Sequence, residues 1–166
     1  SSLRSLDGSH NLIGDRIPYA IGKLHKLRIL RLNHNQLRAT LADALGLCNE
    51  LTVLELQHNY LVGPVPAAFG ALSRLEHLDL SHNLLERELP DSIDGMQALQ
   101  VLLLQNNQLE GGIPTSVGAL QQLSRINIAS NLLTDPIPAE IVTCNLLESI
   151  NLQYNSITGP LPSGIW

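Results

Sequence analysis

Leucines and other aliphatic residues recur along the chain at a fixed spacing, always together with an asparagine. In one unit the recurring residues are Leu51, Leu54, Leu56, Asn59 and Leu61. The same arrangement surrounds seven asparagines, namely Asn11, Asn35, Asn59, Asn83, Asn107, Asn131 and Asn155. Successive members lie 24 residues apart (35 − 11 = 24). One unit cannot cover its own apolar side, so the pattern predicts stacked repeats that bury a continuous core.

Within each unit the alternation of leucine with polar residues predicts a short strand. In Leu54-Glu55-Leu56 the leucines face inward, whereas Glu55 and Gln57 face outward. Seven such strands are expected to stack in parallel. Each repeated asparagine lies where the chain leaves the strand, and its amide can bond backbone groups that the turn leaves unpaired. The seven asparagines are therefore expected to form a ladder.

The second half of the unit predicts a turn and then a short helical segment. Glycines at positions such as Gly63 and Gly111 permit the turn, and the proline that follows ends local strand pairing. The segment from Pro66 to Leu72 is expected to form a helical turn on the outer face.

These motifs resemble those of the leucine-rich repeat family. The glycine and proline half of each unit is similar to the plant-specific subclass, which includes receptor-kinase ectodomains and polygalacturonase-inhibitor proteins. The resemblance implies an α/β fold, a right-handed curved solenoid with a parallel β-sheet on the concave face and short helical turns on the convex face. It also implies a non-catalytic module that recognises a protein or peptide, in a cell-surface receptor or a secreted inhibitor.

Several positions depart from the repeat, and we interpret them as local bends. Asp15, Ala39, Arg87 and Asp135 replace the turn glycine, while Asp94 and Val142 replace a glycine of the outer segment. We expect residues 1–166 to form a single array of seven repeats. Leu3 already belongs to one unit and Trp166 ends another, without polar capping segments, so we expect an excerpt of a longer protein.

The outward strand positions are the candidate recognition surface on the concave face. Amides and histidines there can donate and accept hydrogen bonds, which suits an extended peptide or a protein loop. Val101 and Leu103 add an exposed apolar spot, for which solubility gives no reason. The alternative is that exposed strand positions are polar for solubility alone. The candidate binding residues are Arg31, Glu55, Gln57, His58, His77, Asp79, His82, Val101, Leu103, Gln105, Arg125, Asn127, Asn151 and Tyr154.

Four of the residues that precede the repeated asparagines are histidines: His10, His34, His58 and His82. If the sheet forms, their imidazoles stack about 5 Å apart. Two neighbours could chelate a transition metal, or the column could repel itself when protonated below about pH 6. The third interpretation is that this exposed position accepts any polar residue, and we predict no metal site.

Cys48 and Cys144 both occupy a core position that leucine fills in other units, four repeats apart. At about 4.8 Å per strand their separation is far beyond the reach of a disulfide. We therefore expect two buried free thiols.

Enzymatic motifs are absent from the sequence. It has no glycine-rich phosphate loop, no zinc-binding H-E-x-x-H pattern and no nucleophile elbow. Asp79, Ser81 and His82 include the residue types of a catalytic triad, but an open sheet offers them no enclosed pocket. We expect no enzymatic activity and no cofactor.

Composition and charge narrow the functional classes further. Hydrophobic residues make up 44% of the chain and the formal net charge is −5, which argues for a packed core and against nucleic-acid binding. No apolar run is long enough for a membrane span. The resemblance implies an extracellular or cell-surface location, in a larger membrane-anchored protein or complex.

An intracellular location is the alternative, because the sequence has no N-x-[ST] glycosylation acceptor, no signal peptide and no cysteine caps. In that location the chain would be a scaffold or an assembly subunit of a larger complex. A purely structural spacer is a third possibility.

Overall fold

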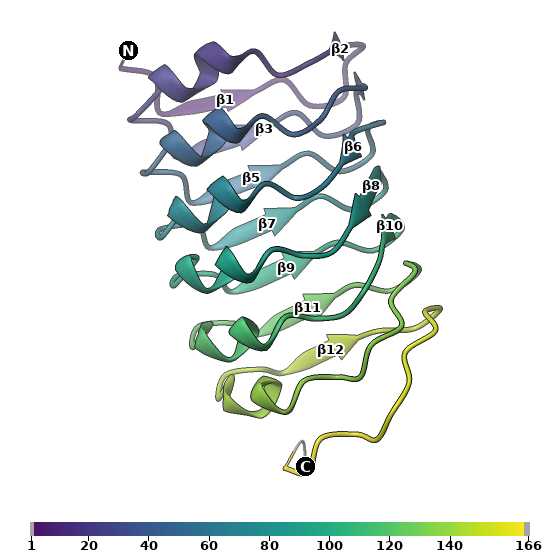
Figure 1. The fold of residues 1–166 in the computed structure, drawn as a ribbon. Helices are drawn as coiled ribbons and strands as arrows, with labels where there is room; N and C mark the ends of the chain where they lie inside the picture. The colour runs from purple at the N-terminus through teal and green to yellow at the C-terminus, as the bar shows by residue number, and fades with distance from the viewer. Residues whose placement is uncertain (1, 165–166) are drawn as a thin grey trace.

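Seven short strands form one parallel sheet along the whole stack (Figure 1). The structure is a computed structural model that describes residues 2–164, so the predicted repeat end at Trp166 lies outside it. Each strand residue pairs with the residue one repeat later, as Leu54 does with Leu78. In spatial order the strands are β1 (Ser5–Asp7), β3 (Ile29–Arg31), β5 (Val53–Glu55), β7 (His77–Asp79), β9 (Val101–Leu103), β11 (Arg125–Asn127) and β12 (Ser149–Asn151).

The predicted outer helical turns are five-residue 3-10 helices on the side opposite the sheet (Figure 1). Five of the six follow a proline, whose ring fixes φ near the value that the segment needs; Pro66, for example, has φ −65°. Ala42 takes this place before the second helix. The helices are η1 (Tyr19–Lys23), η2 (Asp43–Leu47), η3 (Ala67–Ala71), η4 (Asp91–Gly95), η5 (Thr115–Ala119) and η6 (Ala139–Thr143).

Shorter strands pair at one edge of the coils, between the main sheet and the helices. The turn at or just after the end of these strands needs a left-handed residue, and Gly63 and Gly111 supply it with φ of 76° and 67°. Arg87 and Asp15 adopt the same conformation, with φ of 67° and 65°, so the turn persists there without glycine. These strands are β2 (Gly14–Asp15), β4 (Gln36–Leu37), β6 (Val62–Gly63), β8 (Leu84–Arg87) and β10 (Gln108–Leu109).

The core is a stack of aliphatic side chains that runs through all coils. The inward leucine before each strand is fully buried in five successive repeats: Leu27, Leu51, Leu75, Leu99 and Leu123. Helices of neighbouring coils lie so close together that a Cβ added at Gly46 would be 2.3 Å from the Ala68 carbonyl oxygen. The repeat therefore specifies a solenoid, as its spacing predicts.

Both cysteines are buried and free, as predicted. The Cys48 thiol donates to the Ile21 carbonyl oxygen at 3.4 Å, and the Cys144 thiol donates to that of Val117 at 3.3 Å. Burial raises the pKa of both thiols. The thiolate form of each cysteine is therefore disfavoured in the folded protein.

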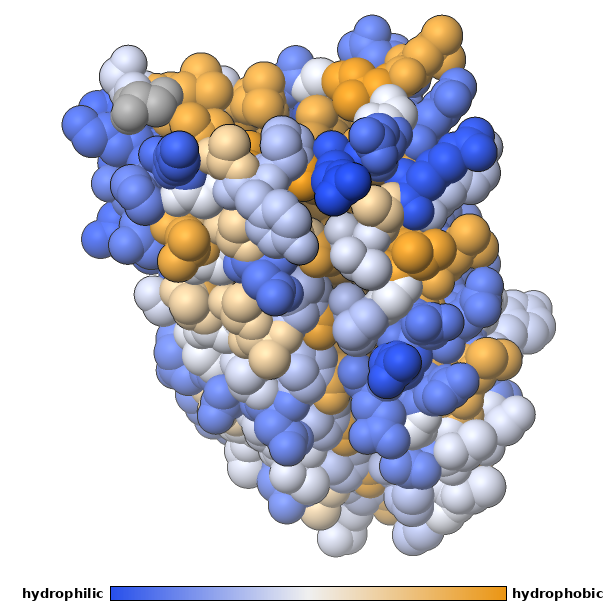
Figure 2. All heavy atoms as spheres, turned by 45° about the horizontal axis from the view of Figure 1, so that its top comes forward, coloured by the Kyte–Doolittle hydropathy of each residue, from blue (hydrophilic) through white to orange (hydrophobic). Residues whose placement is uncertain are grey.

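Exposed apolar side chains gather at the first coil, and single ones such as Leu47 and Leu132 lie on later coils. Figure 2 shows the helical side with the N-terminal end turned forward, and apolar side chains gather over that end. Leu12 and Ile13 are among the exposed apolar residues of the first coil. Among the described residues, none of the helices has the length and apolar content needed to cross a bilayer.

Candidate recognition face

The outward strand positions lie together on one side of the main sheet, which we call the concave face. Charges at its N-terminal end pair with one another. Arg31 Nε donates to Glu55 Oε2 at 2.9 Å, and Arg31 Nη1 lies 4.0 Å from Asp7 Oδ2. The strand register makes this possible, because Asp7, Arg31 and Glu55 are direct neighbours on β1, β3 and β5.

Several residues at outward strand positions are buried, among them Asp79 of the candidate binding residues and its neighbour Ser81, which corrects that expectation. Asp79 is 8% exposed and Ser81 is 2% exposed. Asp79 Oδ1 accepts hydrogen bonds from the Ser81 backbone N–H at 3.0 Å and from the Ser81 hydroxyl at 2.6 Å. The carboxylate thus folds back over its own strand, and the closely spaced neighbouring strands cover both short side chains.

The same backbone contact recurs along the column of Asp79, and sequence reasoning missed it. Asn127 Oδ1 accepts from the Ala129 backbone N–H at 3.1 Å, and Asn151 Oδ1 accepts from that of Gln153 at 3.2 Å. The available signal was an aspartate or asparagine two residues before the N–H that it bonds. These polar side chains therefore stabilise the backbone as well as facing the concave side.

The apolar part of the face lies between polar strands. Val101 and Leu103 on β9 are half-buried rather than fully exposed, since β7 and β11 flank them. His77 is half-buried beside Val101, whereas Arg125 on the other side is exposed. Together these strands place an apolar spot between Asp79 on β7 and the basic Arg125 on β11.

Several side-chain amide oxygens on the concave face lack hydrogen-bond partners. The side-chain oxygens of Asn33, Gln57 and Gln105 are buried without one. All three belong to the column that also contains Ser81, and Asn33 is only 7% exposed. A buried acceptor without a donor costs free energy, so these groups are poised to accept hydrogen bonds.

The four histidines form a continuous stack along the edge of this face. Ring centroids of successive members are 4.3, 4.2 and 4.1 Å apart, with interplanar angles of 12–15°. Every member has a left-handed backbone, with φ between 53° and 55°. At the end of the stack, His82 Nε2 lies 3.2 Å from Asn106 Nδ2. Tyr154, at the equivalent position of the last repeat, is 81% exposed.

Stacking lowers the basicity of the central rings. The pKa of His34 and that of His58 are lowered first by desolvation and then by neighbouring histidines, while the charge of Asp79 opposes the shift. Face-to-face rings direct their nitrogens in parallel, so two of them do not converge on one ion. Within residues 2–164, no group of three or more histidine, cysteine, aspartate and glutamate side chains could hold a metal ion.

The seven asparagines lie in one row behind the concave face. Asn83 Nδ2 donates to the carbonyl oxygens of Leu56 and Leu80, at 3.1 and 3.0 Å. Its Oδ1 accepts from the Leu61 backbone N–H at 3.0 Å. Each interior member thus joins its own coil to the preceding one. Asn11, in the first coil, makes only the donor contacts to Gly8 and Ser9.

The residue types of a catalytic triad do not form a relay. Asp79 bonds Ser81 directly, whereas His82 stacks on His58. A relay would need the histidine between the other two side chains.

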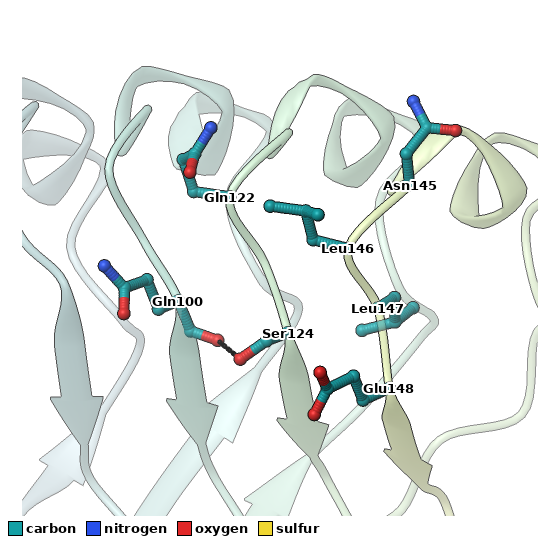
Figure 3. A pocket seen from close by; sticks show the side chains of 7 residues that line it. All are labelled: Gln100, Gln122, Ser124, Asn145, Leu146, Leu147 and Glu148. Carbon is teal, nitrogen blue, oxygen red and sulfur yellow. Dashed lines mark hydrogen bonds between the residues drawn. The ribbon is translucent and has the colours of Figure 1, made fainter.

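A shallow groove on the flank of coils five to seven was not anticipated from the sequence (Figure 3). It is lined by Gln100 and Ser124 on one side and by Leu146 and Glu148 on the other. The Ser124 hydroxyl donates to the Gln100 carbonyl oxygen at 3.0 Å, which ties two coils together. Most of its residues occupy the positions just before the strands that lie between the repeated leucines, and these positions vary from one repeat to the next.

Sequence and structure comparisons agree on the protein family to which this architecture belongs. A family model described as leucine rich repeat matches residues 49–109, and a second with the same description matches residues 146–166. The ectodomain of the receptor kinase SOBIR1 from Arabidopsis thaliana is 30% identical, with a TM-score of 0.73 over 81% of this chain and 76% of that chain. The chain belongs to the leucine-rich repeat family. No curated protein sequence matches it significantly.

Two further receptors match this leucine-rich repeat chain over most of its length. The crystal structure of a TDR receptor is 32% identical, with a TM-score of 0.96 over 98% of this chain. The Arabidopsis receptor kinase HAESA, in complex with the peptide hormone IDA and the co-receptor SERK1, is 31% identical, with a TM-score of 0.90 over 94%. The chain spans 28% and 26% of those two chains. The chain thus resembles plant-type members of the family.

Proposed function

We propose that this chain is a non-catalytic recognition module of a plant-type receptor, which binds an extended peptide or a protein loop on its concave face. The observation that carries the proposal is the set of polar groups on that face whose hydrogen-bonding capacity is unused. The buried oxygens of Gln57 and Gln105 are the clearest members. HAESA, a similar structure, is a complex with a peptide hormone, which supports a peptide as the ligand class.

The proposed binding surface extends over the central and late coils. Its polar contacts would come from Gln57, His58, Gln105, Asn127 and Asn151, and its apolar contacts from Val101 and Leu103. At the N-terminal end, Arg31 and Glu55 are already paired and would define the border. By the same likeness, the module would face the extracellular side of a membrane-anchored receptor.

A selection from a displayed random nonapeptide library tests this proposal. Wild-type protein is expected to enrich peptides whose affinity, measured by fluorescence anisotropy, falls at least tenfold in Leu103→Glu. The matched control is Leu84→Glu, which places the same charge on an exposed leucine of β8, away from the concave face. Equal losses in both variants, or no enriched peptide, would overturn the proposal.

A further inference from the structure

Asp79 is a buried carboxylate on the concave face without a cationic partner. Its Oδ1 accepts both hydrogen bonds from Ser81, and its Oδ2 has no hydrogen bond or ion pair among residues 2–164. The acidic residues of the preceding coils differ, because Asp7 and Glu55 share Arg31. Asp79 Oδ2 is not one of the buried atoms without a partner, so it stays open to the concave side, where a cation could pair with it.

The fold does not require the negative charge of Asp79. Asn127 and Asn151 occupy the same column and make the same backbone contact through a neutral amide oxygen. An asparagine at position 79 would therefore be sufficient for the structural contact. The negative charge of Asp79 opposes the lowering of the pKa of His34 and His58, but it forms no ion pair among residues 2–164.

The surroundings of Asp79 suit a cation with a long apolar stem and several N–H donors. Across the sheet, Leu103 is its direct neighbour on β9 and Glu55 is its neighbour on β5. In the adjacent column, Gln57 and Gln105 flank Ser81 from the coils on either side, and both have an oxygen without a donor. Rotation of these flexible side chains would turn each oxygen toward a ligand.

We propose that Asp79, Gln57, Gln105 and Leu103 form a binding site for an arginine side chain of the ligand. This inference rests on the proposed peptide-binding function. The planar guanidinium has five donors, which match the free carboxylate oxygen and the two amide oxygens. Its aliphatic stem packs on Leu103. A lysine ammonium is a compact point charge and matches this spread of acceptors less well.

The test uses nonapeptides selected from the displayed library by the wild-type protein. We expect arginine to be enriched at one position of these peptides. Each peptide is then synthesised with arginine or with citrulline, which is neutral and has nearly the same shape. For the wild type, citrulline should weaken binding about tenfold or more. For Asp79→Asn, the two peptides should bind within about twofold of each other.

The control variant is Glu86→Gln, which removes one negative charge from the exposed strand β8. It should keep the wild-type preference for arginine, since it leaves the concave face unchanged. Circular dichroism of Asp79→Asn should match that of the wild type, because the contact to Ser81 is retained.

The outcomes separate the two proposals. Peptides that bind in a Leu103-dependent manner but show no preference for arginine over citrulline would overturn the arginine site and leave the proposed function standing. An equal preference in the wild type and in Asp79→Asn would also overturn the site. Failure to enrich any peptide would overturn both.

Discussion

Asn83 Oδ1 accepts a hydrogen bond from the backbone N–H of Leu61, which lies on the preceding coil, at 3.0 Å. The same amide donates to carbonyl oxygens of its own coil and of the preceding one. One buried side chain therefore satisfies backbone groups that the turn leaves unpaired, and links two repeats. This contact is the unit from which the asparagine row is built.

Replacing Asn83 with leucine should destabilise the protein strongly. The variant leaves the Leu61 N–H and the associated carbonyl groups buried without partners, at a cost of about 3 kcal/mol in the free energy of unfolding. Asn11→Leu is the matched control. It should cost about 1 kcal/mol, because Asn11 is exposed and makes only two donor contacts. Urea denaturation measures both, and equal losses would contradict this role of the interior asparagines.

Arg87→Gly should stabilise the protein. Arg87 has φ of 67°, and a left-handed backbone costs a residue with a Cβ about 1 kcal/mol that glycine does not incur. The neighbouring change Glu86→Gly serves as the control and should destabilise by about 0.5–1 kcal/mol, since glycine weakens an ordinary strand position. Thermal denaturation should move the two midpoints in opposite directions. A lower midpoint for Arg87→Gly would show that its side chain contributes more than the strain costs.

The histidine stack should make stability depend on pH. The pKa values of His34 and His58 are lowered in the folded state, so the unfolded chain binds protons more readily there. Their contribution is complete above the unfolded value near pH 6.5 and is lost as the pH falls from there through the lower folded values. Between pH 7.5 and 5.0, the Tm of the wild type should fall about 2 °C more than that of a His34→Gln, His58→Gln variant. Parallel Tm profiles for the two proteins would contradict this origin.

Cys48 and Cys144 should resist thiol reagents in the folded protein. Both are buried, and burial raises the pKa of each thiol, which leaves little reactive thiolate. A chromogenic disulfide reagent should label neither residue of the folded protein within minutes at pH 8. In denaturant it should label both residues immediately. The control Ser73→Cys, at an exposed position, should label immediately in the folded state. Rapid labelling of the wild type would mean that the coils open readily.

The fold could be predicted because the residues of each repeat specify its local structure. Leu54 and Leu56 specify the inward face of a strand, Gly63 the left-handed turn and Pro66 the start of the outer helix. A spacing of 24 residues without insertions then leaves the coils in register, so that identical positions become neighbours. The outer helices and the parallel sheet are both confirmed by the structure.

The details of the concave face were decided by tertiary structure. Alternation along a strand predicts that Asp79 and Ser81 point outward, and it contains no information about how far neighbouring coils cover them. Their burial arises because strands 24 residues apart in sequence lie side by side and because Asp79 bonds the backbone of Ser81. Likewise, Arg31 and Glu55 become an ion pair only after stacking. The sequence alone determined which residues face the core, because inward and outward positions follow from local periodicity. Which surface charges remain unpaired was decided by the tertiary structure, because ion pairs form between residues of different coils.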